Sequence, residues 1–439
     1  MGRRLSRRTL LTGVAAATFG GASRVTRSRR GLDRFWEVTS SPAADAAIEA
    51  YAFPSSVSRG QPLHLHVASR YRRLSGLAAR VGRTGLEPAQ VFDVTMSGSM
   101  TSVKIETGMF AAGLYLVVLR PADGSEHVRF VPVAVRDDRN PASVVVHIPT
   151  ATYQAYNAWG GASLYDFDSP GGAADHVSMD RPYDVFDGAG FCFYGDYHLA
   201  SWLDAEGISA DFIMSNDLHG SPSALRGRTL FVSAFHDEYW SQEMRNNLHR
   251  FIGSGGNAAF LGANNIYARV TFDADGRTLS TAPKGSPRRF RDLGQPEDEL
   301  LGSWYDAYRF PYGLGAAWEA RNTDHWIYNG TGMNDGDRID GLIGYEWDHA
   351  RVENRSPHVT VLSETQVAPG TPPQRCGLQR PRPRHRRQRG NHLLATIPYR
   401  NRYVPHRSAS HHHDPQHPYQ PQLTRCCATG PADGPARVG

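Results

Sequence analysis

Cysteine is scarce in this chain of 439 residues. Three of its four cysteines (Cys376, Cys426 and Cys427) lie close to the C-terminus, and only Cys192 lies elsewhere. A single cysteine in the body of the chain excludes a disulfide framework and a zinc site built from cysteines. The fold must therefore be stabilised by a hydrophobic core, which a chain of this length can bury and divide between two domains.

Lysine is almost absent, and positive charge is unevenly placed. The two lysines are Lys104 and Lys284, and arginine supplies the rest of the positive charge. Residues 1–30 carry eight arginines and no acid, and residues 375–439 carry twelve arginines and two aspartates, so a net charge of +5 leaves −13 on residues 31–374. An acidic body argues against a nucleic-acid groove, because neutralising phosphates takes a basic face.

Long apolar runs are also missing. Beyond the N-terminal segment no run approaches the 18 apolar residues that cross a membrane, so we expect no membrane span once that segment is removed. Residues 1–30 combine two arginines at 7 and 8, a mildly apolar stretch at 10–19 and small residues after it. This order predicts a twin-arginine signal and export to the cell envelope or the extracellular space. A basic, membrane-anchoring helix is the alternative.

The next part of the chain has the alternation of short strands. A polar linker is expected at 31–45, followed by a small β-sandwich-like domain at 46–137, because apolar and polar residues alternate in short runs that turn residues separate about every ten positions. These runs begin at Leu63, Ala89, Ser102, Gly113 and Phe130.

Continuous apolar runs alternate with helical spacing in residues 138–370. Runs at 144–148, 211–214, 230–235 and 258–261 are typical of strands that are covered on both faces. Between them, residues 197–206 and 241–252 have helical spacing, and the second stretch has Ser241 as a candidate N-cap, Glu243 in its first turn and Gly253 at its end. The alternation predicts an α/β domain with a doubly wound, mostly parallel sheet. Residues 270–345 are expected to form loops over the site.

The tail at 371–439 differs in composition from the rest. It has no glutamate, is rich in Pro, His and Arg, and keeps a strand-like period only at 393–397. Such composition favours a disordered basic segment. Our preferred hypothesis is a shifted reading frame in GC-rich DNA, since acids and periodicity disappear together. An intact frame on sequencing the coding DNA would eliminate that hypothesis.

Polar and aromatic residues follow three of the expected strands. The first strand leads into an aromatic, glycine-rich loop that contains Tyr156 and Tyr165, the third ends in His236-Asp237-Glu238, and the fourth ends in Asn264-Asn265. In open α/β sheets, ligands bind at the carboxyl ends of the parallel strands. The three junctions are therefore expected to face one edge of the sheet and to converge there.

The residue types at these junctions suit a metal centre. Carboxylate and phenolate oxygens are hard anionic ligands, and tyrosine serves as an iron ligand in some proteins. A cation held by them could polarise a carbonyl oxygen or activate water. His236 lies two residues from Glu238, an offset that could place it beside a metal-bound water as its acid–base partner.

Each residue also has a structural interpretation. Glu238 could favour the N-terminus of the following helix through its charge. His236 could be a satisfied polar group at a strand end, and the tyrosines could form a packed aromatic cluster. Asn264-Asn265 could be a turn, and Asp180–Tyr183 could hold an ion pair. Only the joint placement of these residues at strand ends favours the functional interpretation.

Several separated blocks resemble one family. They are the tyrosine-rich loop at 153–165, Asp-Arg-Pro-Tyr at 180–183, Ser-Asn-Asp-Leu-His at 215–219, His-Asp-Glu-Tyr-Trp at 236–240, Gly-Ala-Asn-Asn at 262–265 and Gly-Tyr-Glu-Trp-Asp at 344–348. Together they resemble the C-terminal domain of the large (beta) subunit of N,N-dimethylformamidase, over roughly residues 140–350. The resemblance implies a class I glutamine-amidotransferase-like fold, one iron ion held by two tyrosines and a glutamate, and hydrolysis of the C–N bond of a small amide.

Carried over residue by residue, the resemblance implies Tyr156, Tyr165 and Glu238 as iron ligands, with Tyr153 a close rival of Tyr156. It implies His236 as a catalytic residue and suggests Glu346 as a second one. A small partner subunit, which this chain does not encode, or a homo-oligomer is expected.

Two other hypotheses compete with an exported amide hydrolase. The protein could be a non-catalytic cell-surface protein that binds a carbohydrate or a peptide in an aromatic cleft. It could also be an inactive, truncated member of the family if the tail is not native. Buried oxygens that converge favour the enzyme, and outward-facing rings along a groove favour the binding protein.

Overall fold

The structure is a computed structural model that describes residues 47–165, 169, 171–283, 285–308, 316–343, 346–350 and 359–365, and the backbone of two later strands, 374–379 and 394–396. The twin-arginine segment, the linker and the rest of the tail lie outside the described residues. The described residues all belong to one compact unit.

Two sheets near the N-terminus share one hydrophobic core. One sheet has the order β1-β3-β6 and the other has the order β2-β8-β7-β4-β5. The strands are β1 (Ile48–Ala52), β2 (Ser56–Ser58), β3 (Leu63–Ser69), β4 (Arg73–Gly82), β5 (Gly85–Thr95), β6 (Thr101–Ile105), β7 (Gly113–Pro121) and β8 (Arg129–Arg136). All five runs predicted in this part lie in observed strands.

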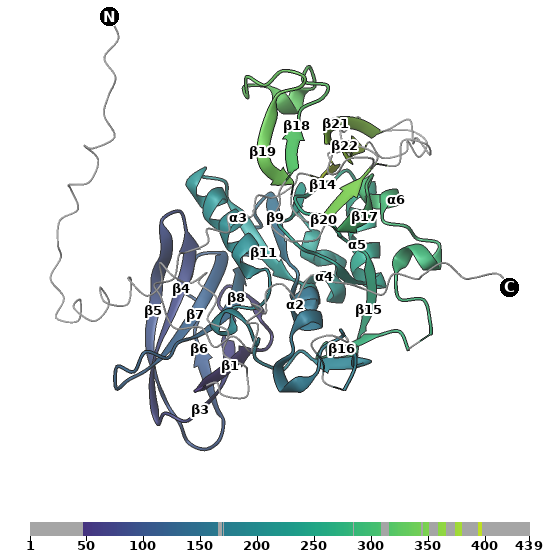
Figure 1. The fold of residues 1–439 in the computed structure, drawn as a ribbon. Coiled ribbons are helices and arrows are strands. Elements are labelled where there is room, and N and C mark those ends of the chain that lie inside the picture. The colour runs from purple at the N-terminus through teal and green to yellow at the C-terminus, as the bar shows by residue number, and fades with distance from the viewer. Residues whose placement is uncertain are drawn as a thin grey trace, which may run out of the picture. The chain divides into compact units, whose positions relative to one another are not determined.

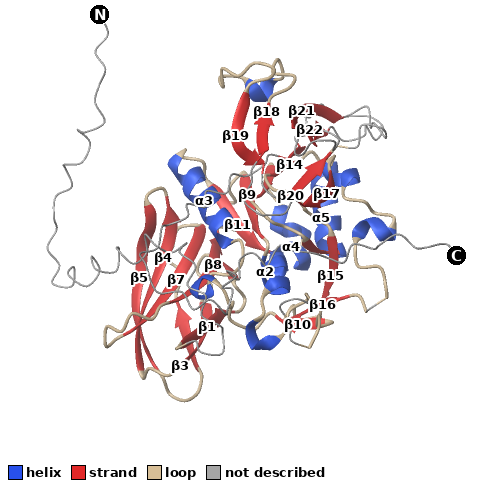
Figure 2. Ribbon diagram, in the orientation of Figure 1, coloured by secondary structure: helices blue, strands red, loops and turns tan. Residues whose placement is uncertain are grey.

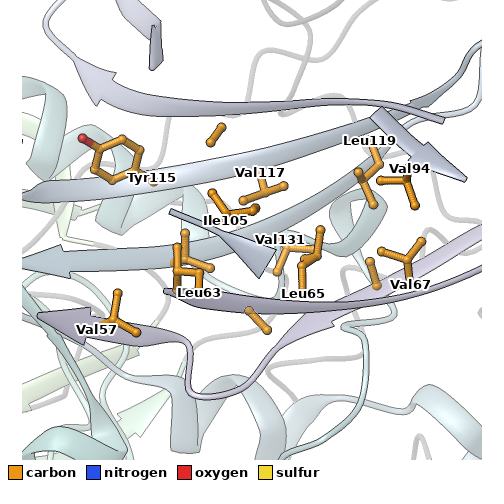
Figure 3. Packing of buried hydrophobic residues seen from close by; sticks show 14 of the residues in the cluster. Val57, Leu63, Leu65, Val67, Val94, Ile105, Tyr115, Val117, Leu119 and Val131 are labelled. Atoms are coloured by element: carbon orange, nitrogen blue, oxygen red, sulfur yellow. The ribbon is translucent and has the colours of Figure 1, made fainter. Parts of the chain in front are cut away.

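Alternation along each strand builds this core. In β3, Leu63, Leu65 and Val67 are buried, whereas the residues between them are more exposed. They pack against Val117 and Val131 from the facing sheet (Figure 3). This is the side-chain arrangement that a period of two residues produces when one face of each sheet is buried.

A seven-stranded sheet forms the centre of the second part, in the order β11-β9-β12-β14-β23-β22-β21 (Figure 1). Its first five strands pair in parallel and its last two pair antiparallel. These strands are β9 (Val144–Ile148), β11 (Ala210–Met214), β12 (Leu230–Ser233), β14 (Asn257–Phe260), β21 (Val359–Thr365), β22 (Gln374–Gln379) and β23 (Leu394–Thr396).

Few helices accompany this sheet. They are α2 (Thr150–Tyr156), α3 (Phe193–Ala205), α4 (Ser215–Gly220), α5 (Gln242–Gly253) and α6 (Asp298–Leu301). Ser241 caps α5 by accepting a hydrogen bond from the N–H of Met244, as its sequence predicts. Met244, Leu248 and Ile252 follow at helical spacing and pack into the core beneath the sheet.

The predicted fold class is wrong. Strands predominate in the described part of the chain, and they are divided among six sheets of mixed and antiparallel pairing (Figure 2). This is not a doubly wound, class I glutamine-amidotransferase-like α/β fold, although five parallel strands lie side by side in one of its sheets.

The main cause of the error is the region predicted as loops at 270–345. It contributes most of three small sheets, which are β10-β16-β15-β13, β17-β20 and β18-β19. The strands in this region are short, and those such as β16 and β18 bury few of their side chains completely, so no apolar period distinguishes them from loops. They are β10 (His176–Ser178), β13 (Tyr239–Ser241), β15 (Ala268–Phe272), β16 (Thr278–Thr281), β17 (Trp304–Tyr308), β18 (Ala316–Glu319), β19 (Arg338–Ile343) and β20 (Glu346–His349).

Among the residues the structure describes, no helix is long and apolar enough to cross a membrane.

Candidate active site

Three chain segments meet at the carboxyl ends of β9, β12 and β14. These strands are neighbours in the sheet and run in parallel, so the residues after them emerge at the same edge. Helix α2 follows β9, His236-Asp237-Glu238 follows β12, and Asn264 follows β14. The sheet thus brings together residues that lie about a hundred positions apart in the sequence.

Two phenol oxygens and one carboxylate oxygen form a tight triangle at this edge of the sheet. The hydroxyl oxygens of Tyr156 and Tyr165 lie 2.6 Å and 3.0 Å from the same oxygen of Glu238, Oε2. The two hydroxyls are 2.8 Å from each other, and their rings stack with a centroid distance of 4.4 Å. The three residues named as ligands from the sequence therefore converge on one point.

Burial makes this an unusual place for acidic groups. Tyr156 and Glu238 are buried, and Tyr165 is largely covered. Burial, and after it the charge of Glu238, raises the pKa of both tyrosine hydroxyls well above the usual value. In this arrangement the phenols keep their protons, and a cation at the triangle would stabilise their ionised forms.

His236 lies between Glu238 and Glu346. Its Nε2 is 3.4 Å from Glu238 Oε2 and 3.2 Å from the Tyr156 hydroxyl, and its Nδ1 is 3.5 Å from Glu346 Oε2. Burial lowers the pKa of His236, but its hydrogen bond with Glu238 and the charge of Glu346 outweigh that effect and raise it. Burial raises the pKa of Glu346 to about 7, with Glu238 adding to the increase and His236 opposing it.

Glu346 reaches the site from the β17-β20 ribbon. It is the first residue of β20, and its Oε1 accepts a hydrogen bond from the Tyr305 hydroxyl of β17 at 3.2 Å. The side-chain amide of Asn264 also donates to Glu346. Next along β20, Asp348 accepts the Asn264 backbone N–H at 2.8 Å, which fastens the ribbon to the turn after β14.

Two further aromatic rings, Phe191 and Tyr239, pack around the triangle. Phe191 packs on Tyr156 with a centroid distance of 4.8 Å and contacts His236 edge-on. Tyr239 lies edge-on to both Tyr156 and Tyr165. Tyr239 belongs to the His-Asp-Glu-Tyr-Trp block, whereas Phe191 lies outside every predicted motif, so only its three-dimensional placement reveals it.

Tyr153 points elsewhere. It is fully buried, and its hydroxyl donates a hydrogen bond to Asp196 of α3. It lies on α2 three residues before Tyr156, and only Tyr156 approaches Glu238.

The block at 180–183 supports the tyrosine loop. Arg181 is buried and donates hydrogen bonds to the carbonyl oxygens of Gln154, Trp159 and Ala162 at 2.7, 3.1 and 2.7 Å. Asp180 of the same block pairs with Arg277. The contacts of Arg181 fix the loop between Tyr156 and Tyr165.

The sandwich also holds this loop. The indole N–H of Trp159 donates to Glu49 of β1 at 3.0 Å. Trp159 lies between Tyr156 and Tyr165 in the sequence, so a residue of the first β-domain contributes to the position of the site.

The triangle has the dimensions of a small-cation site. Small divalent cations bind oxygen at about 2.0–2.2 Å, so oxygens in adjacent coordination positions lie roughly 2.8–3.1 Å apart. The observed separations of 2.6, 2.8 and 3.0 Å are those of O–H···O hydrogen bonds, and they are also close to that range. Within the described part of the chain, no three His, Cys, Asp or Glu side chains gather as metal ligands.

Comparison with known proteins identifies the family. The profile of the family described as "N,N-dimethylformamidase beta subunit-like, C-terminal" matches residues 98–404, more than two thirds of the chain. The protein belongs to this family. All five residues singled out as ligands or catalytic groups lie inside the match, which begins within the first β-domain and ends after β23. The family resemblance predicted from the sequence is thus confirmed.

Other comparisons add little. A search of curated proteins finds no match. A cycloisomaltooligosaccharide glucanotransferase of Paenibacillus sp., solved with cycloisomaltoheptaose, is 7% identical with a TM-score of 0.18. The alignment covers 62% of this chain and 61% of that one, less than two thirds of its length. A likeness this weak says nothing about the fold or function of this member of the N,N-dimethylformamidase beta subunit-like family.

Proposed function

We propose that this protein is an exported, metal-dependent hydrolase that cleaves the C–N bond of a small amide. Tyr156, Tyr165 and Glu238 would hold one iron ion. The observation that carries the proposal is the triangle of one carboxylate and two phenol oxygens, all within 3.0 Å of one another in a buried site. Membership of an N,N-dimethylformamidase-like family supports the choice of an amide as the substrate.

The bound cation would supply a Lewis acid that polarises the amide carbonyl or lowers the pKa of water. The protein's own residues provide proton transfer. His236 faces the triangle through Nε2 and Glu346 through Nδ1, so it can take a proton on one side and exchange one with Glu346 on the other. Tyr305 and Asn264 hold the Glu346 carboxylate by hydrogen bonds.

The aromatic rings supply the environment of the reaction. Phe191 and Tyr239 exclude water from one side of the triangle, which strengthens electrostatic interactions there. The rings point inward and are packed against the ligands. This geometry supports a catalytic centre more than the alternative of an open, ring-lined groove for a carbohydrate or a peptide.

Metal analysis together with an amidase assay tests the proposal. The full-length protein is expected to contain one iron per chain and to release dimethylamine from N,N-dimethylformamide or a related small amide. Glu238→Ala should lose both the iron and the activity. A protein without metal, and a Glu238→Ala variant identical to it, would eliminate the proposal.

Export and assembly are further parts of the proposal. Export rests on the twin arginines at 7 and 8, and processing of the leader in a host with and without the twin-arginine pathway tests it. Assembly with a small subunit or as a homo-oligomer rests on the family's description as beta subunit-like. A monomeric mass for the active protein by light scattering would rule assembly out.

A further inference from the structure

Asp237 lies between the two functional residues of its segment and faces the other way. His236 and Glu238 both contact Tyr156, whereas the side chain of Asp237 reaches back under the sheet. Neighbouring side chains point to opposite sides of an extended segment, so any movement of Asp237 moves the two residues beside it.

Three donors hold the Asp237 carboxylate. Oδ2 accepts from Nδ1 of His147 at 2.8 Å and from the Ser233 hydroxyl at 2.9 Å, and Oδ1 accepts from the indole N–H of Trp240 at 2.6 Å. All four side chains are fully buried. A buried carboxylate with every oxygen satisfied is rigid, and leaving its donors without an acceptor is costly.

The hydrogen bonds continue from His147 to the helix that carries Tyr156. Nε2 of His147 is 3.2 Å from the Ser215 hydroxyl, which accepts the backbone N–H of Ala151 at 3.0 Å. Ala151 lies in the first turn of α2, where N–H groups have no partner within the helix. With Nδ1 of His147 donating to Asp237, Nε2 is free to accept from Ser215.

One buried chain of contacts therefore links the two elements that bear ligands. It runs from Asp237, next to Glu238, through His147 and Ser215 to α2, which ends at Tyr156. A second contact ties the same elements, since the Tyr239 N–H donates to the Thr152 hydroxyl at 3.0 Å. These buried contacts on the far side of the segment thus set the separation of Glu238 and Tyr156.

We infer that Asp237 and His147 are positioning residues that fix the distance between the ligands Glu238 and Tyr156 and so determine iron affinity. The inference rests on the proposed function, because it takes these two residues as iron ligands. Residues that orient metal ligands typically change metal affinity by about 10–100-fold when replaced.

The test compares Asp237→Asn with Asp211→Asn. Asp211 is a matched control because it is an equally buried carboxylate in the same sheet, held by Arg228 and by two backbone N–H groups. It lies at the start of β11, the end opposite to the site. Both variants are titrated as full-length apoprotein with ferric iron, and the tyrosinate-to-iron absorption and the melting temperature are recorded.

Asp237→Asn is expected to weaken iron binding by about 10–100-fold and to shift the absorption maximum. Asp211→Asn should lower the melting temperature with iron affinity within about threefold of wild type. Iron affinity and absorption of Asp237→Asn equal to those of the control would overturn the inference, since the role of Asp237 would then be in stability alone.

If Asp237→Asn does not fold, Ser233→Ala replaces it, because it removes one hydrogen bond to Asp237 and little volume. It should weaken iron binding severalfold, and wild-type affinity would again overturn the inference. A wild-type protein that binds iron without hydrolysing amides would refute the proposed function only. A wild-type protein that binds no iron would remove both.

Discussion

Glu238 is the residue on which the site depends, because Tyr156, Tyr165 and His236 converge on its Oε2. Its place after a buried strand could be predicted from the sequence. The choice between Tyr153 and Tyr156 could not, because the two lie three residues apart on one helix and packing decides which of them faces the site. Phe191 and Tyr305 escaped notice since neither is near a motif.

Replacing Tyr165 by Phe is expected to weaken and shift the tyrosinate-to-iron absorption, because the variant lacks one of the two phenol oxygens in the triangle. Tyr153→Phe is the control. It should keep the absorption but lose about 1–3 kcal/mol of stability, because the buried Asp196 loses a donor. Absorption spectra and chemical denaturation of both variants test this. Equal spectra for the two variants would show that the ligand roles of the tyrosines have been assigned wrongly.

Glu346→Gln should reduce the rate of amide hydrolysis by about 10²–10⁴-fold with iron content unchanged, because a general acid–base partner is lost and no ligand is. The exposed Glu299 provides the control as Glu299→Gln. Steady-state kinetics and metal analysis of both variants test this prediction. A Glu346→Gln variant of full activity would show that His236 exchanges protons without Glu346.

At the scale of elements, the sequence predicted strands and helices well where burial was complete. The parallel strands β9, β11, β12 and β14 and the capped helix α5 all lie where continuous apolar runs and helical spacing placed them. Short strands such as β16 and β18 bury few of their side chains completely, and β17 pairs with β20, which lies much further along the chain. The ribbon that carries Glu346 was therefore taken for a loop, and the fold class was wrong.

Arg181→Met is expected to cost about 3 kcal/mol or more in the free energy of unfolding, since three buried carbonyl oxygens lose a charged donor. It should also weaken iron binding, because the loop between Tyr156 and Tyr165 is released. Arg288→Met, which removes a partly exposed ion pair, should cost under about 1 kcal/mol. Equal losses of stability and equal iron affinities in the two variants would contradict the role given to Arg181.

At the scale of the whole molecule, the question that the sequence raised was whether the tail from residue 371 belongs to the fold. Two strands of that segment pair within the seven-stranded sheet, where β23 lies beside β14. The family match also extends to residue 404. The prediction of a disordered or frameshifted tail stays a prediction, and the pairing of β23 suggests where to test it.

A chain that ends at residue 404 is expected to keep the stability of the full-length protein. A chain that ends at 370 lacks β22 and β23, which leaves the edge of β14 uncovered and should favour aggregation and a lower melting temperature. Thermal melts and light scattering of the two chains measure the difference. Identical behaviour would mean that the whole segment from 371 contributes nothing to the fold.

The central claim is that Tyr156, Tyr165 and Glu238 form an iron site for amide hydrolysis. The most direct test measures iron per chain by mass spectrometry, and dimethylamine release from N,N-dimethylformamide, in the full-length protein and in Glu238→Ala. This account predicts one iron and measurable hydrolysis in the first protein and neither in the second. Iron-free wild-type protein, or iron and activity that persist in Glu238→Ala, would contradict it.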